Sequence, residues 1–156
     1  MAWHEPLVKV WEMGYFELGE ALAALPDADV WTRPHPKLLS VGEIVAHLVY
    51  WEANDFPKAS DASLLVTEAA RYYTSNIEAP LVLDIGGQQL HSEANRNFEA
   101  CKAAFLATPR SEDEPNPSRK EWTWRQTLEY KSFHVAYHTG QVYSVRHLLG
   151  HETVDN

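Results

Sequence analysis

Four segments of the chain repeat apolar residues at intervals of three and four positions, the spacing that lines up one face of an α-helix. These segments cover residues 7–25, 40–56, 88–107 and 123–149. Prolines and charged stretches separate them, and proline cannot continue the interior of a helix. Four amphipathic helices joined by three connections predict an all-α four-helix bundle.

Two of the expected helices have recognisable starts. Ser40 followed by Glu43, and Thr123 followed by Gln126, each fit a capping box, in which two side chains satisfy the free backbone amides of a first turn. Gly150 stands where a residue in the left-handed conformation commonly ends a helix. We therefore expect the second helix to begin after Ser40 and the fourth to run from Thr123 to the glycine.

The connections are less regular than the helices. Residues 31–36 and 110–120 combine prolines with polar or charged residues, so both are expected to be loops. Residues 58–87 form a short irregular or helical insertion between the second and third helices. Within it, residues 64–73 could form a short helix, and residues 79–84 are the one brief strand candidate.

Length, charge and hydropathy exclude several classes of protein. The 156 residues are expected to form one domain, residues 1–156, with a formal net charge of −9 that repels nucleic acids and anionic membranes. No run of apolar residues is long enough to span a bilayer, and the first ten residues lack the pattern of a signal peptide. We therefore expect a cytoplasmic protein with no nucleic-acid or membrane partner.

The cysteine content narrows the chemistry further. Cys101 is the single cysteine of the chain, which excludes an internal disulfide framework and a multi-cysteine zinc module. It lies on the apolar face of the third expected helix. We therefore expect it to be a small buried side chain rather than a nucleophile.

Three of the eight histidines form a candidate metal site. His134 and His138 are four residues apart, so the second ring lies about 6 Å along the helix and is rotated by about 40°. His47 lies on the face of the second helix that is expected to point inward. Three neutral imidazoles would leave coordination positions open, as catalytic metal sites do. Gln141, on the same stripe as His138, and Trp51, one turn beyond His47, are the candidate pocket residues.

The histidines do not fit two common metal-binding motifs. A zincin requires Glu directly after its first histidine, but Val135 follows His134. A di-iron carboxylate bundle requires Glu three residues before a histidine, and the residues at those positions are Ile44, Gln88, Lys131 and Val135. A purely structural alternative stays open, in which the three histidines are hydrogen-bonded core residues with no ligand.

The segments that carry these histidines resemble a known family. Residues 40–52, Ser-Val-Gly-Glu-Ile-Val-Ala-His-Leu-Val-Tyr-Trp-Glu, are similar to the second-helix signature of the DinB/YfiT-like superfamily of metalloenzymes. Residues 134–141, followed by residues 146–150, resemble its fourth-helix signature. The end of the first helix at residues 24–27 also fits. The resemblance covers most of the chain, from about residue 7 to residue 150.

The resemblance implies an up-down-down-up bundle that is often a homodimer. It implies a divalent ion, commonly nickel or zinc, held by His47, His134 and His138. Characterised branches use low-molecular-weight thiols such as bacillithiol, mycothiol or glutathione. The expected function is therefore a metal-dependent hydrolase or thiol S-transferase that acts on a small molecule. The alternative is a non-catalytic module that binds a metal or ligand in stress response or assembly.

Overall fold

The computed structural model describes residues 2–56, 63–71 and 79–153. Its described part is mostly helical, as the sequence predicts, with one small antiparallel sheet. The long helices are α1 (Glu5–Leu22), α2 (Val41–Asp55), α3 (Gly87–Leu106) and α4 (Trp124–Leu148). The short elements are the 3-10 helices η1 (Asp27–Asp29) and η3 (Glu68–Ala70) and the strands β1 (Pro115–Asn116) and β2 (Arg119–Thr123).

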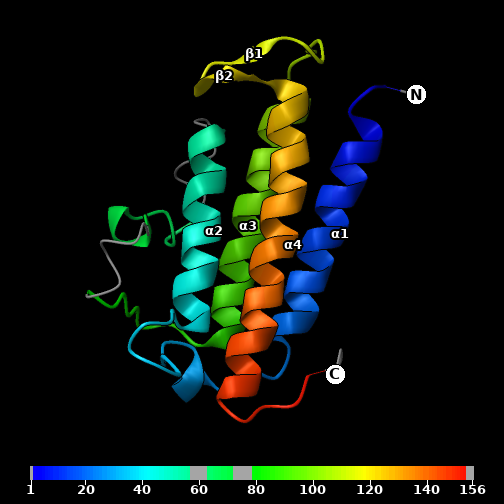
Figure 1. Cartoon of the computed structure of the whole chain (residues 1–156). Helices are drawn as coiled ribbons and strands as arrows, with labels where there is room; N and C mark the ends of the chain where they lie inside the picture. The colour runs from blue at the N-terminus through cyan, green and yellow to red at the C-terminus, as the bar shows by residue number, and fades with distance from the viewer. Residues whose placement is uncertain (1, 57–62, 72–78, 154–156) are drawn as a thin grey trace.

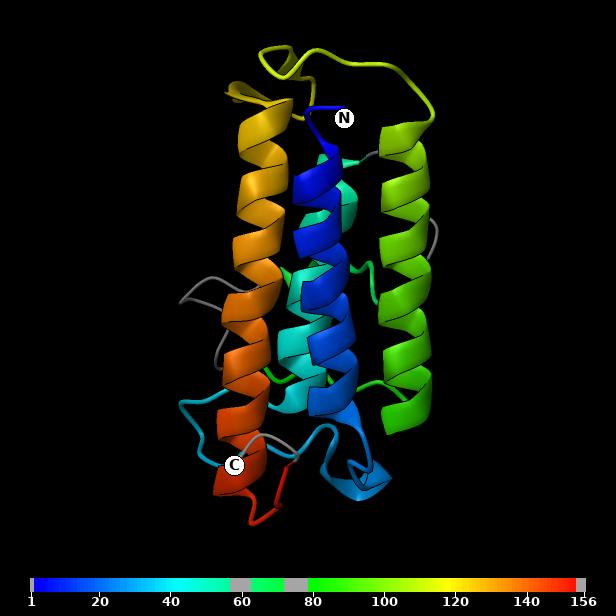
Figure 2. The same cartoon turned by 90° about the vertical axis from the view of Figure 1, so that its right-hand side faces the viewer.

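The four long helices lie side by side (Figures 1 and 2). In both views α1 and α4 run in one direction, while α2 and α3 run in the other. α1 packs against α3 and α4, and α2 packs against the same two helices. The two helices that carry the histidines singled out above, α2 and α4, are therefore direct neighbours.

Both expected capping boxes are present. The Ser40 hydroxyl accepts a hydrogen bond from the Glu43 amide, and the Glu43 carboxylate accepts one from the Ser40 amide. Thr123 and Gln126 make the same reciprocal pair at the start of α4. Gly150 has a φ of 87°, the left-handed conformation that the sequence predicts after the last helix.

The first helix is shorter than its apolar pattern suggests. α1 ends at Leu22, whereas the periodicity continues to Leu25. Arg146 of α4 donates hydrogen bonds to the carbonyl oxygens of Ala21 and Ala23, and Ala24 has a positive φ of 55°. A tertiary partner therefore takes up the last carbonyls of the helix and ends it early.

The expectation of a solvent loop at residues 110–120 is wrong in part, because most of the β1–β2 hairpin lies there. Asn116 is fully buried, and its amide donates to the Asp55 carbonyl and the Thr127 hydroxyl. The hairpin thus lies at the end of the molecule where α2 stops and α4 starts (Figure 1). The prolines and charged residues of this segment suggested an exposed loop, but its buried polar side chain forms hydrogen bonds with α2 and α4.

The insertion before α3 also differs from expectation. Residues 79–84 form no strand, and the Leu81 amide donates to the Glu43 carboxylate instead. The possible helix at residues 64–73 is reduced to the single turn η3, with residues 72 and 73 outside the described part. η3 packs against α2, which brings this insertion to the helix that carries His47.

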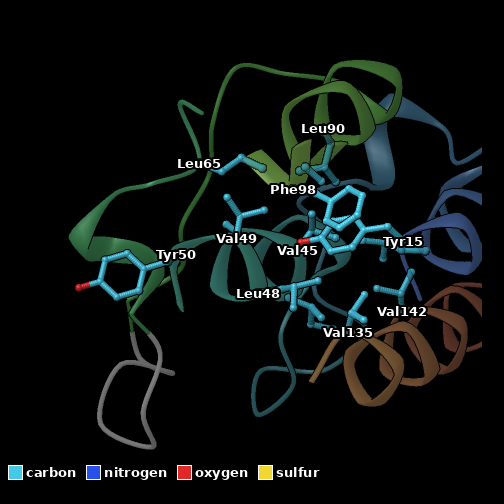
Figure 3. Close-up of a cluster of buried hydrophobic side chains, with 14 of the residues drawn as sticks. Tyr15, Val45, Leu48, Val49, Tyr50, Leu65, Leu90, Phe98, Val135 and Val142 are labelled. Carbon is cyan, nitrogen blue, oxygen red and sulfur yellow. The ribbon is translucent and has the colours of Figure 1, made fainter. Parts of the chain in front are cut away.

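The apolar core fills the space between the helices (Figure 3). Tyr15 of α1 stacks on Phe98 of α3 with ring centroids 4.3 Å apart. Leu48 of α2 and Val135 of α4 are fully buried in the same cluster, and Cys101 is buried as expected. Across the described residues, none of the helices combines the length and apolar character needed to cross a bilayer.

Candidate metal centre

His47, His134 and His138, named here the histidine cluster, meet where α2 packs against α4. One ring nitrogen of each lies within 4.8 Å of the others, close enough to hold a single metal ion. The His134 and His138 Nε2 atoms are 2.9 Å apart. The His47 ring centroid lies 5.7 Å from that of His134 and 5.0 Å from that of His138. The four-residue spacing thus makes two rings converge, and helix packing adds the third.

Gln141 sets the protonation of His138. The two side chains share a hydrogen bond of 2.7 Å between His138 Nδ1 and Gln141 Oε1. Because an amide oxygen can only accept, the His138 proton lies on Nδ1 and the unprotonated Nε2 is directed at His134. The Gln141 amide nitrogen in turn donates to the Tyr137 hydroxyl. Gln141 is therefore a positioning residue for the cluster.

The other two histidines are held by different elements. His47 forms a hydrogen bond with the Ala70 backbone, in the η3 turn. The ring of Tyr130 stacks on His134 with centroids 5.2 Å apart and planes 19° apart. Each ring of the cluster thus has its own support. Ala70 of the insertion contacts His47, and Tyr130 and Gln141 of α4 contact His134 and His138.

Burial favours the neutral form of all three histidines, because it lowers the pKa of each. Burial, followed by the nearby His138, lowers the pKa of His47 from 6.5 to about 4. The same two causes lower the pKa of His134 to about 2. Burial also lowers the pKa of His138, although its hydrogen bond to Gln141 opposes the shift. Neutral imidazole is the form that binds metal ions, so no ring has to give up a positive charge before it binds one at pH 7.

The donor set suits a borderline transition metal such as zinc or nickel, for which imidazole is a preferred ligand. Within the described residues, the buried His134 Nδ1 has no hydrogen-bond partner. Because His138 Nε2 is unprotonated, the 2.9 Å contact between the two Nε2 atoms places the His134 proton on Nε2. A cation bound between these atoms would require that proton to move to the His134 Nδ1 atom.

A layer of aromatic rings surrounds one side of the cluster. The Arg119 guanidinium, from β2, lies 4.6 Å from the Trp122 ring, 5.4 Å from Tyr130 and 5.7 Å from Trp51. Tyr130 stacks on His134, and the candidate residue Trp51 contacts the same Arg119 guanidinium as Tyr130. Tyr130 lies four residues before His134 and could have been found by its spacing. Arg119 could not, because its position depends on the hairpin.

A second polar group lies nearby, with side chains from α2, α4 and β2, and no sequence motif pointed to it. It consists of Glu52, Asp55, Arg119 and Lys131, named here the charged cluster. Asp55 forms ion pairs with Lys131 and Arg119. Glu52 accepts hydrogen bonds from the Trp11 indole, at 2.7 Å, and from the Tyr15 hydroxyl. Burial raises the pKa of Glu52 from 4.5 to about 7, against the opposing effect of Lys131.

Comparison of the chain with known protein families, with curated proteins and with solved structures gave no match. The case for a metal site therefore depends on the three histidines and their surroundings. Two observations distinguish them from ordinary core histidines. Their nitrogens lie close together, and among the described residues no acidic side chain joins the group.

Proposed function

We propose that the chain is a DinB/YfiT-like up-down-down-up four-helix bundle that holds one divalent ion, nickel or zinc, through His47, His134 and His138. The convergence of three neutral imidazoles within 4.8 Å carries the proposal. The opposite directions of the α1, α4 pair and the α2, α3 pair support the bundle assignment (Figures 1 and 2). The sequence signatures on α2 and α4 support the family.

The reaction that this site suits best is that of a metal-dependent hydrolase or thiol S-transferase. His47, His134 and His138 would hold the divalent ion, which would lower the pKa of a bound thiol or water and so favour its deprotonated, nucleophilic form at neutral pH. Three protein ligands leave positions open for that group. Gln141 keeps the His138 proton on Nδ1, and Tyr130 covers one face of His134 and limits its contact with water. The substrate would be a small molecule, with a low-molecular-weight thiol as co-substrate and a homodimer as the working form.

The deciding experiment measures the metal content of protein purified without an affinity tag. The parent should contain about one nickel or zinc per chain, and His138→Ala should contain none. His147→Ala is the matched control, because His147 lies on the same helix but is exposed and outside the cluster. Equal metal content in the parent and both variants would refute the site.

A second measurement separates catalysis from simple binding. The metal-loaded protein should turn over a thiol and an electrophile, and removing the metal with a chelator should abolish the turnover. Retained metal with no turnover across thiol classes would favour the non-catalytic alternative. Sedimentation at several concentrations tests the homodimer independently of either result.

A further inference from the structure

A pocket of about 360 Å³ lies beside the histidine cluster along the same α2–α4 contact. Ile44 is three residues before His47, and Gln141 is three residues after His138, so both stand about one helical turn from the cluster. Because the two helices run in opposite directions, both displacements point the same way. Gln141 therefore touches the pocket and a histidine of the cluster at once.

The walls of this pocket are mainly apolar. Ile44 and Val145 are buried at its base, Leu39 is partly buried, and Leu148 is 64% exposed at its rim. A volume of this size falls in the range of small-ligand sites, which combine apolar walls with a few polar groups. The pocket is thus suited to an apolar body rather than to a sugar or a nucleotide.

The charge of the pocket indicates which polar group its ligand would carry. Among the described residues that line it, Lys37 alone carries a charge, although the whole chain has a net charge of −9. Lys37 belongs to the connection that precedes α2, on the side of Ile44 away from His47. A ligand with an anionic group at Lys37 would therefore direct its other end toward Gln141.

A larger cavity of about 740 Å³ does not compete for such a ligand. It lies between α1 and α3, and its lining includes Glu12, Glu20 and Glu99. The one lysine among its described lining residues, Lys102, is already paired with Glu12 and Glu99. Three carboxylates disfavour an anion, and none of the three clustered histidines reaches this cavity. Size alone therefore does not identify the substrate pocket in this molecule.

We propose that the 360 Å³ pocket binds a small organic anion with an apolar body, for which a medium-chain carboxylate is the simplest example. Its carboxylate lies at Lys37, its chain lies between Ile44 and Val145, and its far end points past Gln141 to the histidine cluster. The assignment of this ligand as the substrate class rests on the proposed metal function. The binding itself does not, because no pocket residue belongs to the cluster.

The test uses octanoate as the probe and titration calorimetry on the metal-free protein. The parent should bind octanoate saturably. Ser144→Phe should weaken binding by about tenfold, because the ring fills the pocket from an exposed helix position. Lys37→Glu should weaken it by about fivefold through charge repulsion, an effect that added salt reduces. Absence of saturable binding by the parent would overturn the proposal.

Matched controls keep the result specific. Ala136→Phe places the same ring at an exposed position of α4 outside the pocket, and Lys120→Glu makes the same charge change on β2. Both should bind octanoate within about twofold of the parent. Equal losses in variants and controls would overturn the assignment of the pocket.

A paramagnetic measurement tests the direction of the ligand. In protein loaded with cobalt(II), the terminal methyl protons of octanoate should relax faster than the protons beside its carboxylate. The reverse order, or no enhancement, would overturn the substrate role. Octanoate binding by a chain that takes up neither nickel, zinc nor cobalt would retain the pocket but refute the metal function. Metal uptake without octanoate binding would refute the pocket alone.

Discussion

The histidine cluster lies on α2 and α4, and the charged cluster lies on the same two helices with Arg119 added from β2. The two clusters balance their polar groups in different ways. In the charged cluster the Lys131 ammonium and the Arg119 guanidinium face the Asp55 carboxylate. In the histidine cluster three basic rings face one another, and no carboxylate from the part of the chain that the structure describes joins them. The first group is compensated by the chain itself. The second has no such partner of opposite charge among the described residues, and this difference makes it the candidate metal site.

The two clusters should also respond to pH with opposite signs. The unfolded chain binds a proton at His47 more tightly than the folded protein does, so this residue costs stability as pH falls from about 6.5 to about 4. Glu52 behaves in the reverse way, because the folded protein holds its proton more tightly. It therefore costs stability as pH rises from about 4.5 to about 7.

Breaking the charged cluster should have the largest effect on stability. Lys131→Met leaves the buried Asp55 with Arg119 as its remaining ion-pair partner, and Lys131 is itself fully buried. We expect a loss of about 3–5 kcal/mol in the free energy of unfolding, measured by urea denaturation. Lys120→Met removes an exposed lysine and should change it by less than about 0.5 kcal/mol. Similar small losses in both would show that the buried pair is not needed.

The pH dependence isolates Glu52. Glu52→Gln keeps a group that can accept from Trp11 and remain paired with Tyr15, but it cannot ionise. At pH 8 it should be more stable than the parent by up to about 3 kcal/mol, and the difference should vanish below about pH 4.5. Thermal unfolding across pH 4–8 measures this. Glu121→Gln, at an exposed position, should run parallel to the parent; a constant offset for Glu52→Gln would contradict the prediction.

Metal should stabilise the parent because it binds the folded state. At a free nickel concentration of 100 times Kd, the free energy of unfolding should rise by about 2.7 kcal/mol. A chelator should reverse the rise, and His138→Ala should show none of it. Differential scanning calorimetry records the change in Tm. An equal rise in His138→Ala would place the bound nickel elsewhere in the chain.

The smallest expected effect comes from removing the hydrogen bond between Gln141 and His138. Gln141→Ala removes the acceptor for His138 Nδ1 and should weaken nickel binding about 10–100-fold, with the fold intact. Gln141→Glu retains an acceptor oxygen at the same place and should restore most of the affinity. Titration calorimetry with nickel distinguishes these variants. If Gln141→Glu binds as weakly as Gln141→Ala, the hydrogen bond does not position the ring.

Sequence reasoning was most reliable where local physics decides structure. The capping boxes at Ser40 and Thr123 form as predicted, because each needs only residues three positions apart. The segments that connect the helices were predicted least well. The polar residues at positions 110–120 form part of a hairpin because Asn116 finds partners on α2 and α4, far from it in sequence. No local pattern contains that information.

The candidate site could likewise be predicted only in part from the sequence. The spacing of His134 and His138 determined, from the sequence alone, that two rings share one face of α4. Whether His47 joins them depended on the packing of α2 against α4, which only the tertiary structure decided. The supports at Ala70 and Arg119, and the pocket between Ile44 and Val145, were likewise beyond the sequence. Helical spacing is set by the backbone within a few residues, whereas convergence between helices depends on how their apolar faces pack.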